Sequence, residues 1–113
     1  MIPYRYGKAT SLEQAAAFLA GNKTGVALLA GGTDLLGEIK EGTAAPSVVL
    51  DLAGIDGLAG IKRGPEGLTI GAMTTLADLA ADKDIERDYA VLGQAALSAA
   101  SPQLRNRGTV GGN

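Results

Sequence analysis

The fold of this chain is decided by one stretch, Val26-Ala27-Leu28-Leu29-Ala30-Gly31-Gly32-Thr33-Asp34-Leu35-Leu36. Its first five residues are all apolar, which is typical of a strand buried inside a parallel sheet. A glycine pair follows, and the next residues predict a helix over 35–41 that Thr33 or Asp34 can cap. The stretch therefore predicts a buried strand, a tight glycine loop and a helix in direct succession.

Working outward, residues 1–54 predict the order strand, helix, strand, helix, strand. Residues 2–6 alternate like a short strand, and Pro3 marks it as an edge strand. Thr10 or Ser11 can open a helix that ends near residue 21, because Glu or Gln follows each of them at capping-box spacing. Residues 48–52 predict another buried strand. The result is a small parallel sheet with right-handed crossovers, whose ligands are expected at the carboxyl ends of the strands.

The pattern changes after Leu52. Residues 58–63 and 67–72 predict two strands of an antiparallel hairpin, joined by a Gly-Pro-Glu-Gly turn at 64–67. Thr75 and Asp78 resemble a capping box that opens a helix to about residue 81. Residues 82–87 are charged and expected to be exposed, residues 89–100 predict a helix stopped by Pro102, and residues 101–113 read as turns. The class is α+β, with a parallel subdomain over 1–54 and the start of an antiparallel one over 55–113.

Composition excludes several kinds of function. The chain has 113 residues, a net charge of −2 and a pI of about 5.0, so no basic surface for nucleic acid is expected. It contains neither cysteine nor histidine, which removes thiolate and imidazole metal ligands and histidine-based catalysis. We therefore assign no metal site and no catalytic acid or base. Without a signal peptide or a membrane-spanning run, a cytoplasmic protein is expected.

The first glycine loop has two interpretations. Paired glycines let main-chain N–H groups turn toward one anion, and the following helix start adds more of them, an arrangement that suits a pyrophosphate. A tight turn is nevertheless the more common role, and neither a Walker loop nor a G-x-G-x-x-G motif is present. Thr33 is the better hydroxyl donor to a phosphate, whereas Asp34 would repel one and suits helix capping.

A second glycine loop, residues 107–113, also has two interpretations. Gly108, Gly111 and Gly112 lie beside Thr109, again combining closely approachable backbone with a hydroxyl. The alternative is a frayed terminus in which Arg105 and Arg107 are merely solvated.

Four stretches together are more specific than either loop. They are Tyr4-Arg5-Tyr6 followed by Ser11-Leu12-Glu13-Gln14-Ala15, then Leu29 to Leu36, then Ile70-Gly71-Ala72-Met73-Thr74-Thr75-Leu76-Ala77-Asp78-Leu79, and finally Ala100 to Asn113. In these stretches, and over its whole length, the chain resembles the FAD-binding subunit or domain of the molybdenum hydroxylase family. That family includes xanthine dehydrogenase and the medium subunit of carbon monoxide dehydrogenase.

The resemblance implies a fold of the FAD-binding type 2 kind, with FAD between a parallel and an antiparallel subdomain. It also implies that electrons pass from iron–sulfur clusters through FAD to NAD or another acceptor, with the clusters and a molybdenum cofactor in partner subunits. The implied cofactor-binding residues are Leu29, Ala30, Gly31, Gly32, Thr33, Asp34, Leu35, Ala72, Thr74, Thr109, Gly111, Gly112 and Asn113.

One departure concerns length, because members of the family run to well over twice 113 residues. The chain is therefore expected to be a truncated form, a proteolytic product or one half of a split protein. Self-association, or a partner chain that supplies the missing C-terminal half, is then expected. The alternative function is a non-catalytic structural or assembly module that carries no flavin.

Overall fold

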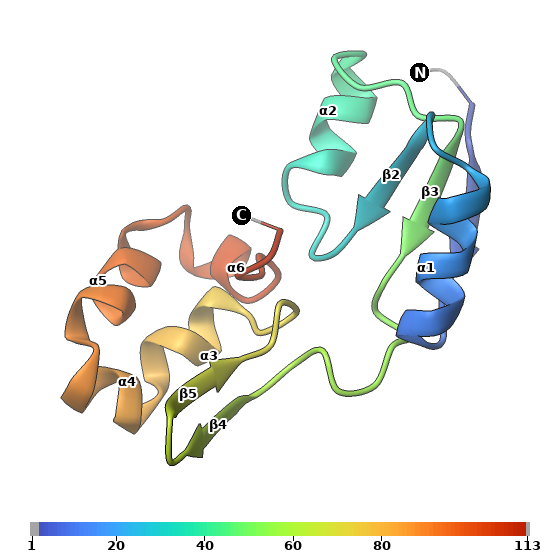
Figure 1. Cartoon of the computed structure of the whole chain (residues 1–113). Coiled ribbons are helices and arrows are strands. Elements are labelled where there is room, and N and C mark those ends of the chain that lie inside the picture. Colours follow the sequence, from blue (N-terminus) through green and yellow to red (C-terminus); the bar gives the residue numbers. More distant parts are fainter. Residues whose placement is uncertain (1–2, 113) are drawn as a thin grey trace. The chain divides into compact units, whose positions relative to one another are not determined.

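The computed structural model describes residues 3–112 (Figure 1). The chain divides into two compact units, the first ending at Asp56 and the second beginning at Gly57. The first unit is built on a three-stranded parallel sheet of β1 (Arg5–Lys8), β2 (Val26–Leu29) and β3 (Val48–Asp51). Helix α1 (Leu12–Gly21) connects β1 to β2, and α2 (Leu35–Glu41) connects β2 to β3. The predicted parallel sheet is confirmed.

Strand order decides which strand is buried. The order is β1-β3-β2, so the last strand in sequence inserts between the first two. All four residues of β3 are buried, whereas β2 lies at an edge and is only half-buried, with Leu28 48% exposed. The prediction of a fully buried strand over 26–30 was therefore wrong. The prediction of a first edge strand is confirmed in kind, but the strand begins at Arg5, and Ile2 lies outside the described residues.

The start of α1 shows why this segment is helical. The Ser11 hydroxyl accepts a hydrogen bond from the Gln14 N–H at 3.0 Å, and the Gln14 side chain accepts one from the Thr10 N–H at 2.6 Å. The two bonds satisfy donors that have no partner inside the helix. Of the two candidate caps, Ser11 is thus the one used.

The second unit begins with the antiparallel hairpin of β4 (Ile61–Gly64) and β5 (Gly67–Ile70), as predicted. Four helices follow: α3 (Leu76–Ala81), α4 (Lys83–Asp88), α5 (Ala90–Ser98) and α6 (Pro102–Arg105). The Thr75 hydroxyl caps α3 by accepting from the Asp78 N–H at 3.1 Å. The core of this unit consists of Leu76, Leu79, Ile85 and Ala96, with hairpin residues such as Leu68 and Ile70 packed against it.

Two helices of this unit were not predicted. The charged segment 82–87 contributes most of α4; its charged side chains are exposed or half-exposed, as expected, but its Ile85 is completely buried. The tail, which was expected to consist of turns, contains the helix α6. Pro102 does not prevent this helix, because it lies in the first turn, where its missing N–H group would have no partner. Helix α5 ends earlier than expected, at Ser98.

Ion pairs join the hairpin to α4. The Arg63 guanidinium lies 3.2 Å from the Asp84 carboxylate and 2.6 Å from the Asp88 carboxylate, and Arg87 pairs with both of these aspartates. These arginines hold the pKa of both carboxyl groups below the usual value. The cluster is solvent-exposed, so its contribution to stability is small.

No helix within residues 3–112 is long and apolar enough to cross a membrane.

Candidate functional site

The first glycine loop leaves the sheet at the carboxyl end of β2. Leu29, the last residue of that strand, is paired in register with Asp51, the last residue of the central strand. Gly32 has a φ of +81°, a conformation that glycine adopts at no steric cost. A Cβ atom there would also lie only 3.1 Å from side-chain carbons of Leu29 and Leu36. The glycine at this position is thus required by the conformation of the loop itself.

The loop presents a row of unused donors. The main-chain N–H groups of residues 31–34 donate no hydrogen bond to any residue that the structure describes, although the Gly32 carbonyl accepts one from Leu36 at 3.2 Å. Thr33 and Asp34 are exposed, and neither side chain hydrogen-bonds within residues 3–112. Consecutive main-chain N–H groups in a turn can together bind one anion.

The cap predicted for α2 is absent. Asp34 stands at the N-cap position with φ −98° and ψ −49°, which is helical backbone, and its carboxylate makes no capping hydrogen bond. A capping side chain normally needs extended backbone at its own residue to reach the N–H groups ahead of it. The prediction that Thr33 or Asp34 caps this helix was therefore wrong, and the N–H groups at the helix start stay available.

Asp51 lies at the carboxyl end of the central strand, and the Tyr6 hydroxyl reaches it from β1; sequence reasoning missed both residues. Asp51 is only 9% exposed, and it accepts hydrogen bonds from the Tyr6 hydroxyl and, at 2.9 Å, from the Ala53 N–H. Burial acts to raise the pKa of Asp51, but these two bonds and the nearby Lys8 charge outweigh it and hold the pKa below its usual value. The sequence feature that could have indicated Asp51 is that it is the single carboxylate in the otherwise apolar run of residues 48–52.

In the second unit, two motifs that are distant in sequence lie side by side. Residues 72–75 pair with residues 108–111: the Val110 N–H donates to the Thr74 carbonyl at 2.9 Å, and the Gly111 N–H donates to the Ala72 carbonyl at 2.8 Å. An antiparallel bridge joins Thr75 to Thr109. The structure therefore brings together five predicted site residues, namely Ala72, Thr74, Thr109, Gly111 and Gly112.

These five residues divide into buried and exposed members. The Thr74 side chain is 2% exposed, and its hydroxyl bonds to both the N–H and the carbonyl of Gly60 at 3.0 and 3.1 Å. Thr109 is 4% exposed and accepts from the Gly112 N–H at 3.2 Å. Both threonines therefore shape the backbone from inside, whereas Ala72, Gly111 and Gly112 are exposed.

Close backbone packing explains the glycines of this region. A Cβ atom on Gly111 would lie 2.8 Å from the Cβ of Ala72, and one on Gly71 would lie 2.2 Å from the Leu58 carbonyl oxygen. Real Cβ atoms do not approach so closely, so both positions exclude every other residue. The exposed surface of residues 72, 111 and 112 thus consists of main chain with no side chain larger than a methyl group.

The predicted site residues accordingly form two groups, 29–35 in the first unit and 72–74 with 109–112 in the second. Asn113 lies outside the described residues. Within residues 3–112, no three acidic side chains cluster closely enough to hold a metal ion.

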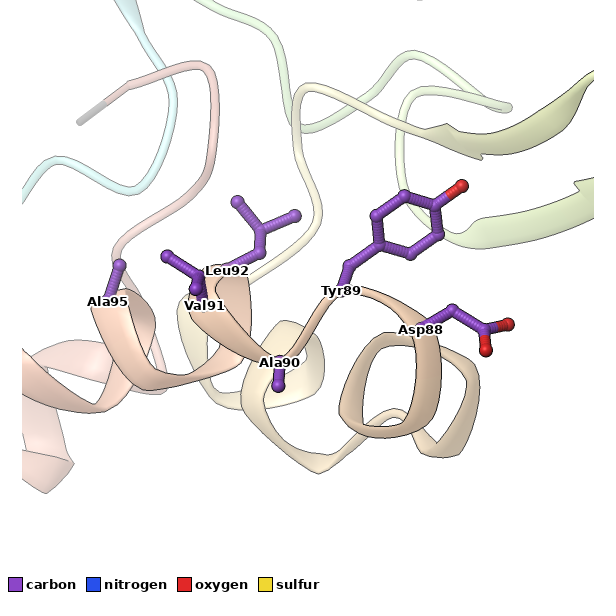
Figure 2. Close-up of a pocket in the computed structure, with 6 residues that line it drawn as sticks. All are labelled: Asp88, Tyr89, Ala90, Val91, Leu92 and Ala95. Carbon is purple, nitrogen blue, oxygen red and sulfur yellow. The ribbon is translucent and has the colours of Figure 1, made fainter.

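A separate pocket opens where α4 passes into α5 (Figure 2). It is lined by Asp88, Tyr89, Ala90, Val91, Leu92 and Ala95. The lining is mainly apolar, and Val91 is 78% exposed. None of the predicted cofactor residues takes part in it.

Comparison with curated proteins finds relatives that are similar to this chain in sequence. The chain is 36% identical to the 6-hydroxypseudooxynicotine dehydrogenase complex subunit alpha of Paenarthrobacter nicotinovorans, over 97% of this chain and 37% of that protein. It is 43% identical to the aldehyde oxidoreductase FAD-binding subunit PaoB of Escherichia coli, over 87% of this chain and 31% of that protein. The chain therefore spans well under half the length of these relatives.

A third relative is similar both in sequence and in solved structure. In sequence, the medium chain of carbon monoxide dehydrogenase from Hydrogenophaga pseudoflava is 37% identical over 100% of this chain and 40% of its own length. A solved structure of carbon monoxide dehydrogenase from that organism superposes with a TM-score of 0.92 at 38% identity, covering 99% of this chain and 40% of the other. Quinoline 2-oxidoreductase from Pseudomonas putida 86 gives a TM-score of 0.90 at 28% identity, covering 99% of this chain and 39% of the other.

The model of one family, described as the FAD binding domain in molybdopterin dehydrogenase, matches residues 2–113. The matched region contains both glycine loops and the 70–79 motif, and the parallel sheet followed by an antiparallel hairpin is the fold of the solved relatives. By sequence and by fold, this chain belongs to the family of FAD-binding domains of molybdopterin dehydrogenases.

Proposed function

We propose that this chain binds FAD and forms part of the electron-transferring flavin subunit of a molybdenum hydroxylase-type oxidoreductase. The observation that carries the proposal is the row of unused main-chain N–H groups at residues 31–34, at the carboxyl end of a parallel sheet. In a chain of this family, the pyrophosphate of FAD is the anion that such a row matches.

Each residue of the first loop has a role in this proposal. Gly31 and Gly32 let the phosphates approach the backbone, and the exposed Thr33 adds a hydroxyl donor. Asp34 contributes its N–H group and not its carboxylate, because a carboxylate repels phosphate. Leu29, Ala30 and Leu35 are half-buried, and they hold the ends of the loop in place while their main chain borders the cofactor.

The second group supplies a surface in place of free N–H donors. The N–H groups of residues 110–112 are already used within the chain, so these residues cannot form a second phosphate cradle of the same kind. The exposed main chain of Ala72, Gly111 and Gly112 instead offers a face on which part of the cofactor can lie. Asn113 stays a proposed cofactor residue from its motif alone. Thr74 and Thr109 hold this face from inside.

FAD supplies, when bound, the transfer of electrons between partner centres and an acceptor such as NAD. The chain itself contains no cysteine and no histidine. We therefore propose that a molybdenum-cofactor subunit and an iron–sulfur subunit are its partners, as the names of its relatives suggest for complexes of several subunits.

A matched pair of threonine substitutions tests the loop. Thr33 and Thr24 are both exposed, and neither hydroxyl makes a hydrogen bond within residues 3–112. Thr33→Val and its control Thr24→Val should therefore leave the free energy of unfolding within about 0.5 kcal/mol of wild type. Loss of a hydrogen bond to a charged phosphate costs about 1.5–3 kcal/mol. Titration with FAD should therefore show a Kd raised at least about tenfold by Thr33→Val and unchanged by Thr24→Val. Equal values for both variants would remove Thr33 from the site.

A further inference from the structure

Arg105, at the end of α6, is not merely solvated, which was one of the two interpretations of this segment. Its Nη1 atom lies 3.0 Å from the Leu97 carbonyl oxygen, 3.1 Å from that of Ala99 and 3.3 Å from that of Ala100. The last carbonyls of a helix have no partner inside the helix, and a guanidinium can satisfy several of them together. Arg105 therefore fastens α6 to the C-terminal end of α5.

The turn between α5 and α6, to which Arg105 donates these hydrogen bonds, contains a strained residue. Ala100 has a φ of +54°, and it is the only residue other than glycine with a positive φ within residues 3–112. This left-handed conformation costs free energy for any residue with a Cβ atom, and it persists where the surroundings enforce it. The hydrogen bond from Arg105 to the Ala100 carbonyl is one contact that enforces it here.

Helix α6 leads directly into the second glycine loop. The Leu104 carbonyl accepts hydrogen bonds from the Gly108 N–H at 2.6 Å and from the Arg107 N–H at 3.1 Å. The Gly108 carbonyl in turn accepts from the Leu76 N–H at 2.9 Å, after which the loop pairs with residues 72–75. A rotation of α6 would therefore displace the loop from its partner segment.

We infer that Arg105 is the positioning residue of the second glycine loop. It holds the α5–α6 turn in its left-handed conformation and so fixes where residues 108–112 lie on residues 72–75. The consequence for FAD affinity rests on the proposed function, whereas the structural part of the inference does not.

Amide hydrogen exchange on the full chain tests the structural part. Arg107 lies two residues away, is exposed, and makes no side-chain hydrogen bond to the described residues, so Arg107→Ala is the matched control. Arg105→Ala should speed exchange of the Val110 and Gly111 N–H groups at least about tenfold relative to the hydrogen-bonded amides of the β4–β5 hairpin, and Arg107→Ala should not. Unchanged exchange at these two groups, or an equal rise throughout the second unit, would overturn the inference.

A second substitution separates positioning from general destabilisation. Glycine adopts the left-handed conformation at no steric cost, so Ala100→Gly added to Arg105→Ala should restore part of the lost protection at Val110 and Gly111. A double variant no better protected than Arg105→Ala alone would contradict the role given to Ala100. If wild type binds FAD, the Kd for FAD should be higher in Arg105→Ala than in wild type, and lower again in the double variant. If folded wild type does not bind FAD, the proposed function fails while the exchange data still decide this inference.

Discussion

Asp51 places a carboxylate that is 9% exposed at the end of the central strand, next to the β2 end from which the glycine loop departs. A buried carboxylate is tolerated only when hydrogen bonds replace its hydration. The Tyr6 hydroxyl and the Ala53 N–H donate these hydrogen bonds. They thereby connect β1 and the turn after β3 to the Asp51 carboxylate. At this scale the frame of the proposed pyrophosphate site is held by polar contacts as well as by apolar packing.

Tyr6→Phe should therefore make stability depend less on pH. In wild type the pKa of Asp51 lies below its usual value, so this carboxylate contributes stability above the unfolded-state pKa of about 4 and loses it as pH falls through the lower folded-state pKa. Removing the Tyr6 hydroxyl should raise the pKa of Asp51. Denaturant melts should show the variant less stable than wild type at pH 7, with the difference shrinking below about pH 4. A difference that does not vary with pH would contradict this account.

Individual residues also mark the limit of sequence reasoning. Thr75 and Ser11 were predictable as helix caps because their partners lie three residues away in sequence. Gly71 and Gly111 belong to motifs, but the reason for each glycine is a backbone far away in sequence, at Leu58 and at Ala72. No local pattern could reveal these contacts, nor that the Thr74 hydroxyl is consumed by Gly60.

At the scale of elements, α4 was one of two helices that the sequence did not predict, the other being α6. Six residues make α4 less than two turns long, and only Ile85 among them is apolar, so no helical periodicity can be recognised. The Asp82 cap, which accepts from the Ile85 N–H at 3.0 Å, was the available signal. The half-burial of β2 escaped prediction for a different reason, because strand order depends on long-range pairing and not on the strand itself.

Ile85→Ala tests whether α4 is an integral part of the second unit. Ile85 is completely buried against Leu76, Leu79 and Ala96, so truncation should cost about 3 kcal/mol, within the usual range of about 2–5. Lys83→Ala, on the same helix with its side chain 90% exposed, should stay within about 0.5 kcal/mol of wild type. Chemical denaturation of both variants measures the difference. A small loss for Ile85→Ala would mean that α4 is not anchored as described.

At the scale of the whole chain, family and fold class were predictable because four motifs occur together, in order, along 113 residues. The parallel sheet and the antiparallel hairpin, which the residue patterns themselves predict, are confirmed. The division of labour between the loops was not predictable. Both look alike as glycine-rich sequence, yet the first leaves its N–H groups free and the second uses them within the chain.

The most direct test of the central claim is a calorimetric titration of the folded chain with FAD, alongside riboflavin, which carries the flavin ring without the pyrophosphate. If the free N–H groups of residues 31–34 bind the pyrophosphate, FAD should bind saturably at one site per chain, and riboflavin at least about tenfold more weakly. Equal affinity for the two ligands, or no FAD binding by a chain shown to be folded, would contradict the proposal that this loop holds the cofactor.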